Sequence, residues 1–342
     1  MRIAFLTDRP GSPDDQAPVF GLGPEAAPIR WGFLELTEDV ASPEGWAWLP
    51  RPGRSDVRFT AAEEVIGTCL KHLARGPQAG LLVHVHGAGN PAPLSFARTG
   101  KLCTLYGGED LELMGLVVSW STGGFGVADY LAARRRLLTA PDALAGALAQ
   151  LFQALALREP GSGDAFLLAH SLGNHLLGCV AGALWEDDPE ALQPAFREVL
   201  LCAADVDDDA LGPEGQLEQV ERIGQEIHVY AYPNDGLPGL SFFGGFFIPG
   251  REGPALGNLG PRPRAASTPG GTPIDTVFWL PAAPPVTLPN EPDPVHHYWH
   301  TEPVMIGDLR AVLRAVSPKR MPWRSWNLFD RPSWTIRGRD PA

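Results

Sequence analysis

A serine that could act as a nucleophile stands in the middle of the stretch AHSLG, residues 169–173. The four apolar residues 166–169 predict a buried strand, and the pattern after Gly173 predicts a helix. At a sharp turn from strand to helix, the hydroxyl of Ser171 would rise above the edge of the sheet. The N–H of Leu172 would point at the same spot, where it could stabilise an oxyanion. The alternative interpretation is a serine that caps an ordinary helix.

A serine hydroxyl needs a base, usually histidine, and a carboxylate that orients the base. Two aspartates follow predicted strands and could supply the carboxylate. Asp235 comes shortly after the strand at 226–232, and Asp205 ends the strand at 196–205. The acid of such a site usually follows the later strand, so we favour Asp235 and keep Asp205 as the alternate.

The base should lie after the last strand, where residues 293–300 read DPVHHYWH. We select His296 as the base and His297 as the alternate, and we expect His300 to pack or to cap a helix. Three histidines in five residues could also suggest a metal site. One general base is enough for this chemistry, so the sequence predicts no metal and no cofactor.

A second oxyanion donor is expected in the sequence HGAGN, which runs from the end of the strand at 81–86. Gly87 lets the backbone curl, and the N–H of Ala88 is the donor that we expect beside that of Leu172. Trp120 ends another predicted strand and should line the same edge of the sheet, because open α/β sheets hold their sites at the carboxyl ends of strands.

Three consecutive arginines, 134–136, form a basic cluster in an otherwise acidic chain. The favoured interpretation is the solvated face of a helix, and the alternative is a clamp for an anionic substrate.

The composition excludes several classes of protein. The net charge of −13 argues against nucleic acid as a partner, because phosphate binding requires a basic surface. The four cysteines are widely spaced and predict reduced thiols rather than disulfides. The apolar stretch at the N-terminus is too short for a signal peptide, and no apolar run reaches about 18 residues. We therefore expect a cytoplasmic protein without membrane contact.

Apolar runs alternate with segments of helical spacing along the chain. This order predicts an α/β fold with a mostly parallel sheet of about eight strands and helices on both faces, in one domain over residues 1–316. The predicted strands are 2–7, 31–36, 81–86, 115–120, 166–169, 196–205, 226–232 and 274–280, and the predicted helices include 61–76, 126–140, 141–157 and 301–316.

Two further segments stand apart from this alternation. A long loop, 233–272, follows the seventh predicted strand, and its apolar segment 242–248 could serve as a lid, a dimer contact or a packing arm. Residues 317–342 are expected to form a C-terminal arm that packs on the domain or on a partner subunit of a homo-oligomer.

Six blocks of this sequence resemble, in the same order, a family of bacterial α/β-hydrolases of unknown function, DUF900. They are HVHGAGN, VVSW, LLAHSLGNHLL, LCAADVDDDAL, VYAYPNDGL and HHYWHTEPVMIGDL. The resemblance covers about residues 80–316 and implies an α/β-hydrolase fold with Ser171 as nucleophile, Asp235 as acid and His296 as base. The chain departs from the family pattern at Ala88 and at residues 121–123, which bears on the acyl pocket rather than on these three residues.

These observations together predict a serine hydrolase of the esterase or lipase type, acting on a small-molecule ester or thioester. Two other functions fit the same residues. One is an acyltransferase in which an alcohol or amine replaces water. The other is a non-catalytic protein of the same fold that binds a ligand or partner.

Overall fold

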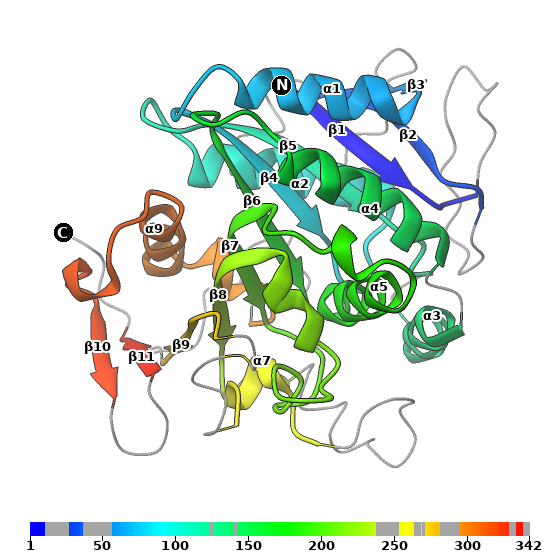
Figure 1. Cartoon of the computed structure of the whole chain (residues 1–342). Helices are drawn as coiled ribbons and strands as arrows, with labels where there is room; N and C mark the ends of the chain where they lie inside the picture. Colours follow the sequence, from blue (N-terminus) through cyan, green and yellow to red (C-terminus); the bar gives the residue numbers. More distant parts are fainter. Residues whose placement is uncertain are drawn as a thin grey trace.

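The computed structural model of the chain describes residues 1–10, 27–36, 57–123, 126–139, 142–236, 253–262, 268, 271–280, 295–327 and 333–337. Within these residues, one sheet of eleven strands runs through the centre of the molecule (Figure 1). The strand order is β10-β11-β9-β8-β7-β6-β4-β5-β1-β2-β3. The strands from β11 to β1 in this order are parallel, and β10, β2 and β3 are antiparallel to their neighbours.

The described strands are β1 (Arg2–Thr7), β2 (Arg30–Glu35), β3 (Val57–Thr60), β4 (Ala79–Val85), β5 (Glu112–Ser119), β6 (Asp164–His170), β7 (Phe196–Cys202), β8 (Gly224–Ala231), β9 (Ile274–Trp279), β10 (Arg324–Asn327) and β11 (Ser333–Ile336). The described helices are α1 (Ala62–Leu73), α2 (Ala92–Tyr106), α3 (Val127–Thr139), α4 (Asp142–Ala156), α5 (Leu172–Asp187), α7 (Leu256–Leu259), α8 (Tyr298–Thr301) and α9 (Pro303–Val312). Short 3₁₀ turns lie at Pro189–Ala191, Glu218–Arg222 and Pro318–Arg320.

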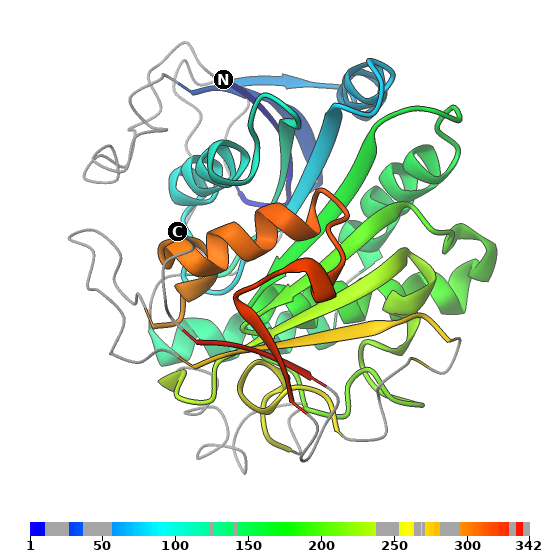
Figure 2. The same ribbon diagram turned by 90° about the vertical axis from the view of Figure 1, so that its left-hand side faces the viewer.

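The helices form a layer on each face of the sheet. Apolar residues of α1, α3, α4 and α5 pack in one core against one face. Helices α2, α8 and α9 cover the other face, where Figure 2 shows α2 in cyan and α9 in orange. Strands covered on both sides read as unbroken apolar runs, and every residue of β4 is buried. The sequence prediction of a mostly parallel sheet flanked by helices is confirmed.

The strand count exceeds the prediction of about eight. The additional strands are β3, β10 and β11, each of four residues. A strand this short shows too little alternation of apolar and polar residues to be recognised from sequence. The helix predicted over 301–316 is α9, which begins at Pro303 and ends at Val312, and the one-turn helix α8 precedes it. The apolar segment 242–248 lies outside the described residues.

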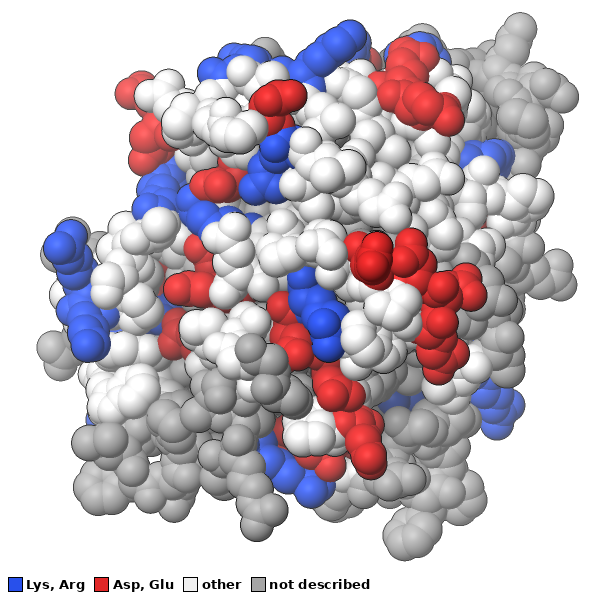
Figure 3. Space-filling view, viewed as in Figure 1, with Lys and Arg blue, Asp and Glu red and all other residues white. Residues whose placement is uncertain are grey.

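Acidic side chains form several contiguous groups on the face shown in Figure 3, while lysine and arginine side chains are more scattered. This distribution agrees with the net charge of −13. Among the described residues, no helix is both long enough and apolar enough to cross a membrane.

Candidate active site

Ser171 occupies a strained turn between β6 and α5. Its backbone has φ 53° and ψ −125°, a conformation that non-glycine residues rarely adopt and that costs about 1–3 kcal/mol. Two glycines make room for this turn. A Cβ on Gly173 would lie 2.5 Å from the Val85 carbonyl oxygen, and a Cβ on Gly87 would lie 2.8 Å from the Cβ of Ser171. The elbow therefore packs directly against the end of β4.

Backbone contacts hold this strained turn in place. The N–H of Ser171 donates to the Cys202 carbonyl at 3.0 Å. The Ser171 carbonyl accepts from the N–H of Asp205 at 3.2 Å, and from the backbone and side-chain nitrogens of Asn174, each at 3.0 Å. The end of β7 and the first turn of α5 thus fix the position of the serine.

Asp235 and His296 meet at the same edge of the sheet, although 61 residues separate them. His296 Nδ1 lies 2.8 Å from Asp235 Oδ2, and the two residues are 4% and 2% exposed. Asn258 Nδ2 donates to the backbone carbonyls of Asp235 at 2.8 Å and Tyr232 at 3.2 Å, which anchors the loop after β8. A carboxylate accepts, so this contact requires a proton on His296 Nδ1 and leaves Nε2 for chemistry.

The segment that contains His296 also packs on the residue before the serine. The rings of His170 and His296 have centroids 4.6 Å apart, and His170 Nε2 lies 3.3 Å from the His296 carbonyl oxygen. Burial, together with the nearby His296, lowers the pKa of His170 well below its usual value, so this ring is neutral. Within the described residues no hydrogen bond joins Ser171 Oγ to His296. Such bonds are often long in unliganded enzymes and tighten when substrate binds.

The side chain of Asn90 holds two carbonyl groups of the loop after β4. The Gly87 carbonyl accepts from Asn90 Nδ2 at 3.1 Å, and the Ala88 carbonyl accepts from the same nitrogen at 2.9 Å. A trans peptide directs its N–H opposite to its C=O, so the Ala88 N–H points away from Asn90. Neither this N–H nor that of Leu172 has an acceptor in the described part of the chain.

Arg9 supports this loop and was missed by the sequence reasoning. Its buried guanidinium donates from Nη2 to the Asn90 carbonyl, lies 3.3 Å from His86 Nε2, and donates from Nε to Ser119 Oγ at 3.1 Å. Burial lowers the pKa of Arg9 to about 10, so it stays charged at neutral pH. Arg9 follows the carboxyl end of β1, and that position was the signal that could have found it.

Trp120 packs against His86, at the start of the same loop. Its indole Nε1 donates to the His86 carbonyl at 2.7 Å, and its ring stacks on that of His86 at a centroid distance of 5.8 Å. The side chain is fully buried, so Trp120 shapes the loop rather than the surface of the site.

The carboxylate of Asp205, the alternate acid, contacts Tyr130 and Arg134. Its carboxylate accepts from the Tyr130 hydroxyl at 2.5 Å and lies 3.4 Å from Arg134 Nη1. The expectation that arginines 134–136 form a solvated face is wrong for two of them. Arg134 is fully buried, and Arg136 is largely buried against Asp8 at 2.5 Å, because both point toward the sheet edge.

His297, the alternate base, packs away from Asp235. Its ring centroid is 4.8 Å from that of His170 and 5.4 Å from that of His300. His300 is buried against Trp299, with ring centroids 4.4 Å apart. Burial and then the neighbouring His297 lower the pKa of His300 well below its usual value. His297 and His300 therefore belong to a cluster of packed rings that also contains His170 and Trp299.

The described residues thus bring Asp235 together with His296 and place Gly87 against Ser171, both at the carboxyl edge of the sheet. A family described as "Alpha/beta hydrolase of unknown function (DUF900)" matches residues 60–242. That is 183 of the 342 residues, and the stretch includes Ser171 and Asp235.

Two other comparisons add little to this match. A solved structure described as "the putative cell surface hydrolase from Lactobacillus plantarum WCFS1" aligns at 12% identity and a TM-score of 0.31, covering 70% of this chain and 93% of that chain. A comparison with curated proteins gives no match. The family match spans more than half of the chain, and the sheet and helices have the arrangement that the family name describes. The chain belongs to the DUF900 family of α/β-hydrolases of unknown function.

Proposed function

We propose that this protein is a serine hydrolase that cleaves a carboxylic ester or thioester through an acyl-enzyme intermediate. The observation that carries the proposal is the buried 2.8 Å contact between Asp235 and His296, in a segment packed against the strained elbow of Ser171. Strain at a non-glycine residue persists only where the surrounding structure enforces it, and such residues cluster at functional sites.

In the proposed reaction, Ser171 Oγ attacks the carbonyl carbon while His296 Nε2 accepts the hydroxyl proton. The tetrahedral intermediate collapses, and the alcohol or thiol leaves with that proton. Water then attacks the acyl-enzyme by the same steps, which releases the acid and restores Ser171. Asp235 keeps His296 in the required tautomer and stabilises the imidazolium that forms.

The oxyanion of each tetrahedral intermediate would be bound by the N–H groups of Ala88 and Leu172. Support comes from the orientation of the Gly87–Ala88 peptide and from the position of Leu172 as the first residue of α5, whose N–H has no partner within the helix. Removal of one such donor typically lowers kcat by about 10²–10³-fold.

The proposal includes a reducing, cytoplasmic location. It is supported by the four cysteines, none of which forms a disulfide and three of which are buried.

The test is labelling of the full-length chain by a fluorescent fluorophosphonate, which reacts with activated serines. We expect labelling of the wild type and its loss in Ser171→Ala and His296→Ala. In Ser171→Ala, kcat on an ester substrate should fall by about 10⁶-fold, because the nucleophile is absent. Ser317→Ala is a matched control at an exposed serine and should label like the wild type.

Absence of labelling in a folded wild-type protein would contradict the proposal and favour a ligand-binding role. If labelling succeeds, nitrophenyl esters of increasing acyl length define the acyl pocket. Product analysis with an added alcohol then separates hydrolysis from acyl transfer.

A further inference from the structure

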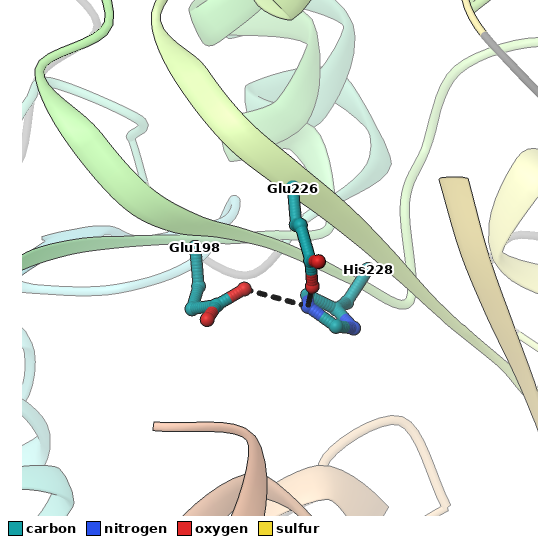
Figure 4. Close-up of side chains that lie close together, drawn as sticks. All are labelled: Glu198, Glu226 and His228. Atoms are coloured by element: carbon teal, nitrogen blue, oxygen red, sulfur yellow. Dashed lines mark hydrogen bonds and ion pairs between the residues drawn. The ribbon is translucent and has the colours of Figure 1, made fainter. Parts of the chain in front are cut away.

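A second cluster of ionisable side chains lies at the opposite edge of the same sheet. Glu198 is near the amino end of β7 and Glu226 near the amino end of β8, and His228 lies midway along β8. One ligand atom from each of the three lies within 4.8 Å of the others. Figure 4 shows Glu198 and His228 pointing toward each other, with the carboxylate of Glu226 beside the imidazole. This cluster is independent of the proposed hydrolase chemistry.

The strand register creates the cluster. Glu198 is the direct neighbour of Glu226 across the β7–β8 pair, and His228 is the neighbour of Asp275 across the β8–β9 pair. Like charges directly opposite each other on neighbouring strands are destabilising. A positive charge beside the two glutamates would therefore stabilise the pair.

Both nitrogens of the His228 ring face carboxylates. Nδ1 lies 3.2 Å from Asp275 Oδ2, and Nε2 lies 2.8 Å from Glu198 Oε2 and 3.6 Å from Glu226 Oε2. A neutral imidazole has one N–H, so it can donate to only one side. The other nitrogen then directs a lone pair at carboxylate oxygens, unless a second proton or a metal ion lies between them.

The surrounding charges leave a deficit of positive charge. Two guanidinium groups form ion pairs with the carboxylates around His228. Arg197 pairs with Glu198 and Asp164. Arg324 pairs with Asp275 and Asp308, and we call this set of charges the network. With Glu226, the network holds five carboxylates against these two cations and the nearby Arg158, whose charge interacts with that of Asp164. Protonation of His228 would still leave one negative charge in excess.

We propose that Glu198, Glu226 and His228 bind a divalent transition-metal ion of the zinc type. Imidazole nitrogen and carboxylate oxygen are zinc ligands, with bond lengths of about 2.0–2.2 Å, so donors of a tetrahedral site lie roughly 3.4 Å apart. The 3.6 Å separation between His228 and Glu226 already matches this spacing. The 2.8 Å separation between His228 and Glu198 needs a small opening.

The outer contacts suit such a site. The carboxylate of Asp275 lies 3.2 Å from His228 Nδ1. A carboxylate at one ring nitrogen commonly orients a metal-binding histidine so that its other nitrogen faces the ion. Arg324 in turn holds Asp275 at 2.5 Å. Arg197 bonds Glu198 Oε1 at 3.1 Å and leaves Oε2 for the ion. The Glu226 side chain is 55% exposed, which gives the ion a route from solvent and room for a water ligand.

Titration calorimetry with zinc on the full-length, chelator-treated protein tests the proposal. We expect one zinc ion per chain and a rise of a few degrees in Tm at saturating zinc. Glu226→Gln should weaken binding by at least about tenfold while leaving the fold intact, because this side chain is half exposed. Asp275→Asn should weaken binding by about 10–100-fold, as loss of an outer contact does.

Glu35→Gln is the matched control, because Glu35 is a half-exposed strand residue paired with Arg2. It should bind zinc like the wild type. Ser171→Ala should also bind normally, since the site lies at the other edge of the sheet. No stoichiometric binding, or binding that survives Glu226→Gln and His228→Gln unchanged, would overturn the proposal. A circular dichroism spectrum shows that each variant is folded.

Discussion

Histidines are buried near both edges of this sheet, but the charges around them differ. Toward the carboxyl edge, burial and then the nearby Arg98 lower the pKa of His84 to about 3. At the amino edge, burial acts on His228 in the same direction. There, hydrogen bonds to Asp275 and Glu198 outweigh burial and raise the pKa of His228 to about 9. Neighbouring charge, rather than depth of burial, decides the protonation state of a buried imidazole.

This difference separates two kinds of site. Burial keeps His84, His86, His170 and His300 neutral toward the carboxyl edge. The amino edge gathers carboxylates and is suited to hold a cation. Substitutions at one edge should therefore change catalysis and leave cation binding intact, and substitutions at the other edge should do the reverse.

The largest effect is expected for Asp235→Asn. The amide keeps the shape of the carboxylate but favours the wrong tautomer of His296, so kcat should fall by about 10⁴-fold. The ester assay measures this effect, and zinc titration of the same variant should be unchanged. Asp205→Asn is the comparison, and a loss as large as that of Asp235→Asn would show that the acid has been misassigned.

The second largest effect is expected for Arg324→Met, which removes a buried cation at the amino edge and should lower the free energy of unfolding. Both side chains of the Arg324–Asp308 pair are fully buried, with Nε and Oδ1 2.6 Å apart. Loss of one partner of a buried ion pair costs about 3–5 kcal/mol, because the other charge is left without compensation. Urea unfolding measures the change. Arg2→Met, at an exposed ion pair with Glu35, should cost no more than about 1 kcal/mol.

If Arg324→Met and Arg2→Met proved equally stable, the amino-edge network would not be a buried ion-pair system. Fluorophosphonate labelling of folded Arg324→Met should match that of the wild type, because the hydrogen bonds of Arg324 go to Asp275 and Asp308.

The stability of the metal-free protein should depend on the pH through His228. Its pKa of about 9 in the folded state lies above the usual 6.5, so the folded state binds the proton more tightly. The resulting stabilisation is complete below about pH 6.5 and is lost as the pH rises toward about 9. The full loss is on the order of 3 kcal/mol.

Unfolding free energies of the wild type and His228→Gln, measured with a chelator, give this contribution as a difference. The difference should shrink between about pH 6.5 and pH 9. A difference that stays constant over this range would show that His228 is neutral in the folded protein.

Much of the carboxyl edge could be predicted from sequence, because its signals are local. Ser171 lies in a strand–turn–helix pattern, and Asp235 and His296 each follow a predicted strand. Asn258 could not be predicted, because it lies within a long loop and acts through the backbone of Asp235. The three four-residue strands gave no periodic signal.

The amino-edge cluster was also missed, for a different reason. Glu198, Glu226 and Asp275 are spread over 77 residues and become neighbours only through strand register. A one-residue shift in pairing would send these side chains to the other face of the sheet. Functional residues at strand ends can thus be predicted from sequence. Clusters of side chains on neighbouring strands can be predicted only when the pairing register of those strands is known.

The smallest effect is expected for Asn90→Ala, which acts on the proposed oxyanion loop without touching the substrate. Asn90 Nδ2 fixes the carbonyls of Gly87 and Ala88, so its loss frees the Ala88 N–H to leave the oxyanion position. We expect kcat to fall by about tenfold with little change in KM, because the interaction strengthens in the transition state. Gln153→Ala, at an exposed position of α4, should leave both constants unchanged. A rise in KM at constant kcat would place Asn90 in substrate binding instead, and would leave the oxyanion donors to be sought elsewhere in the loop.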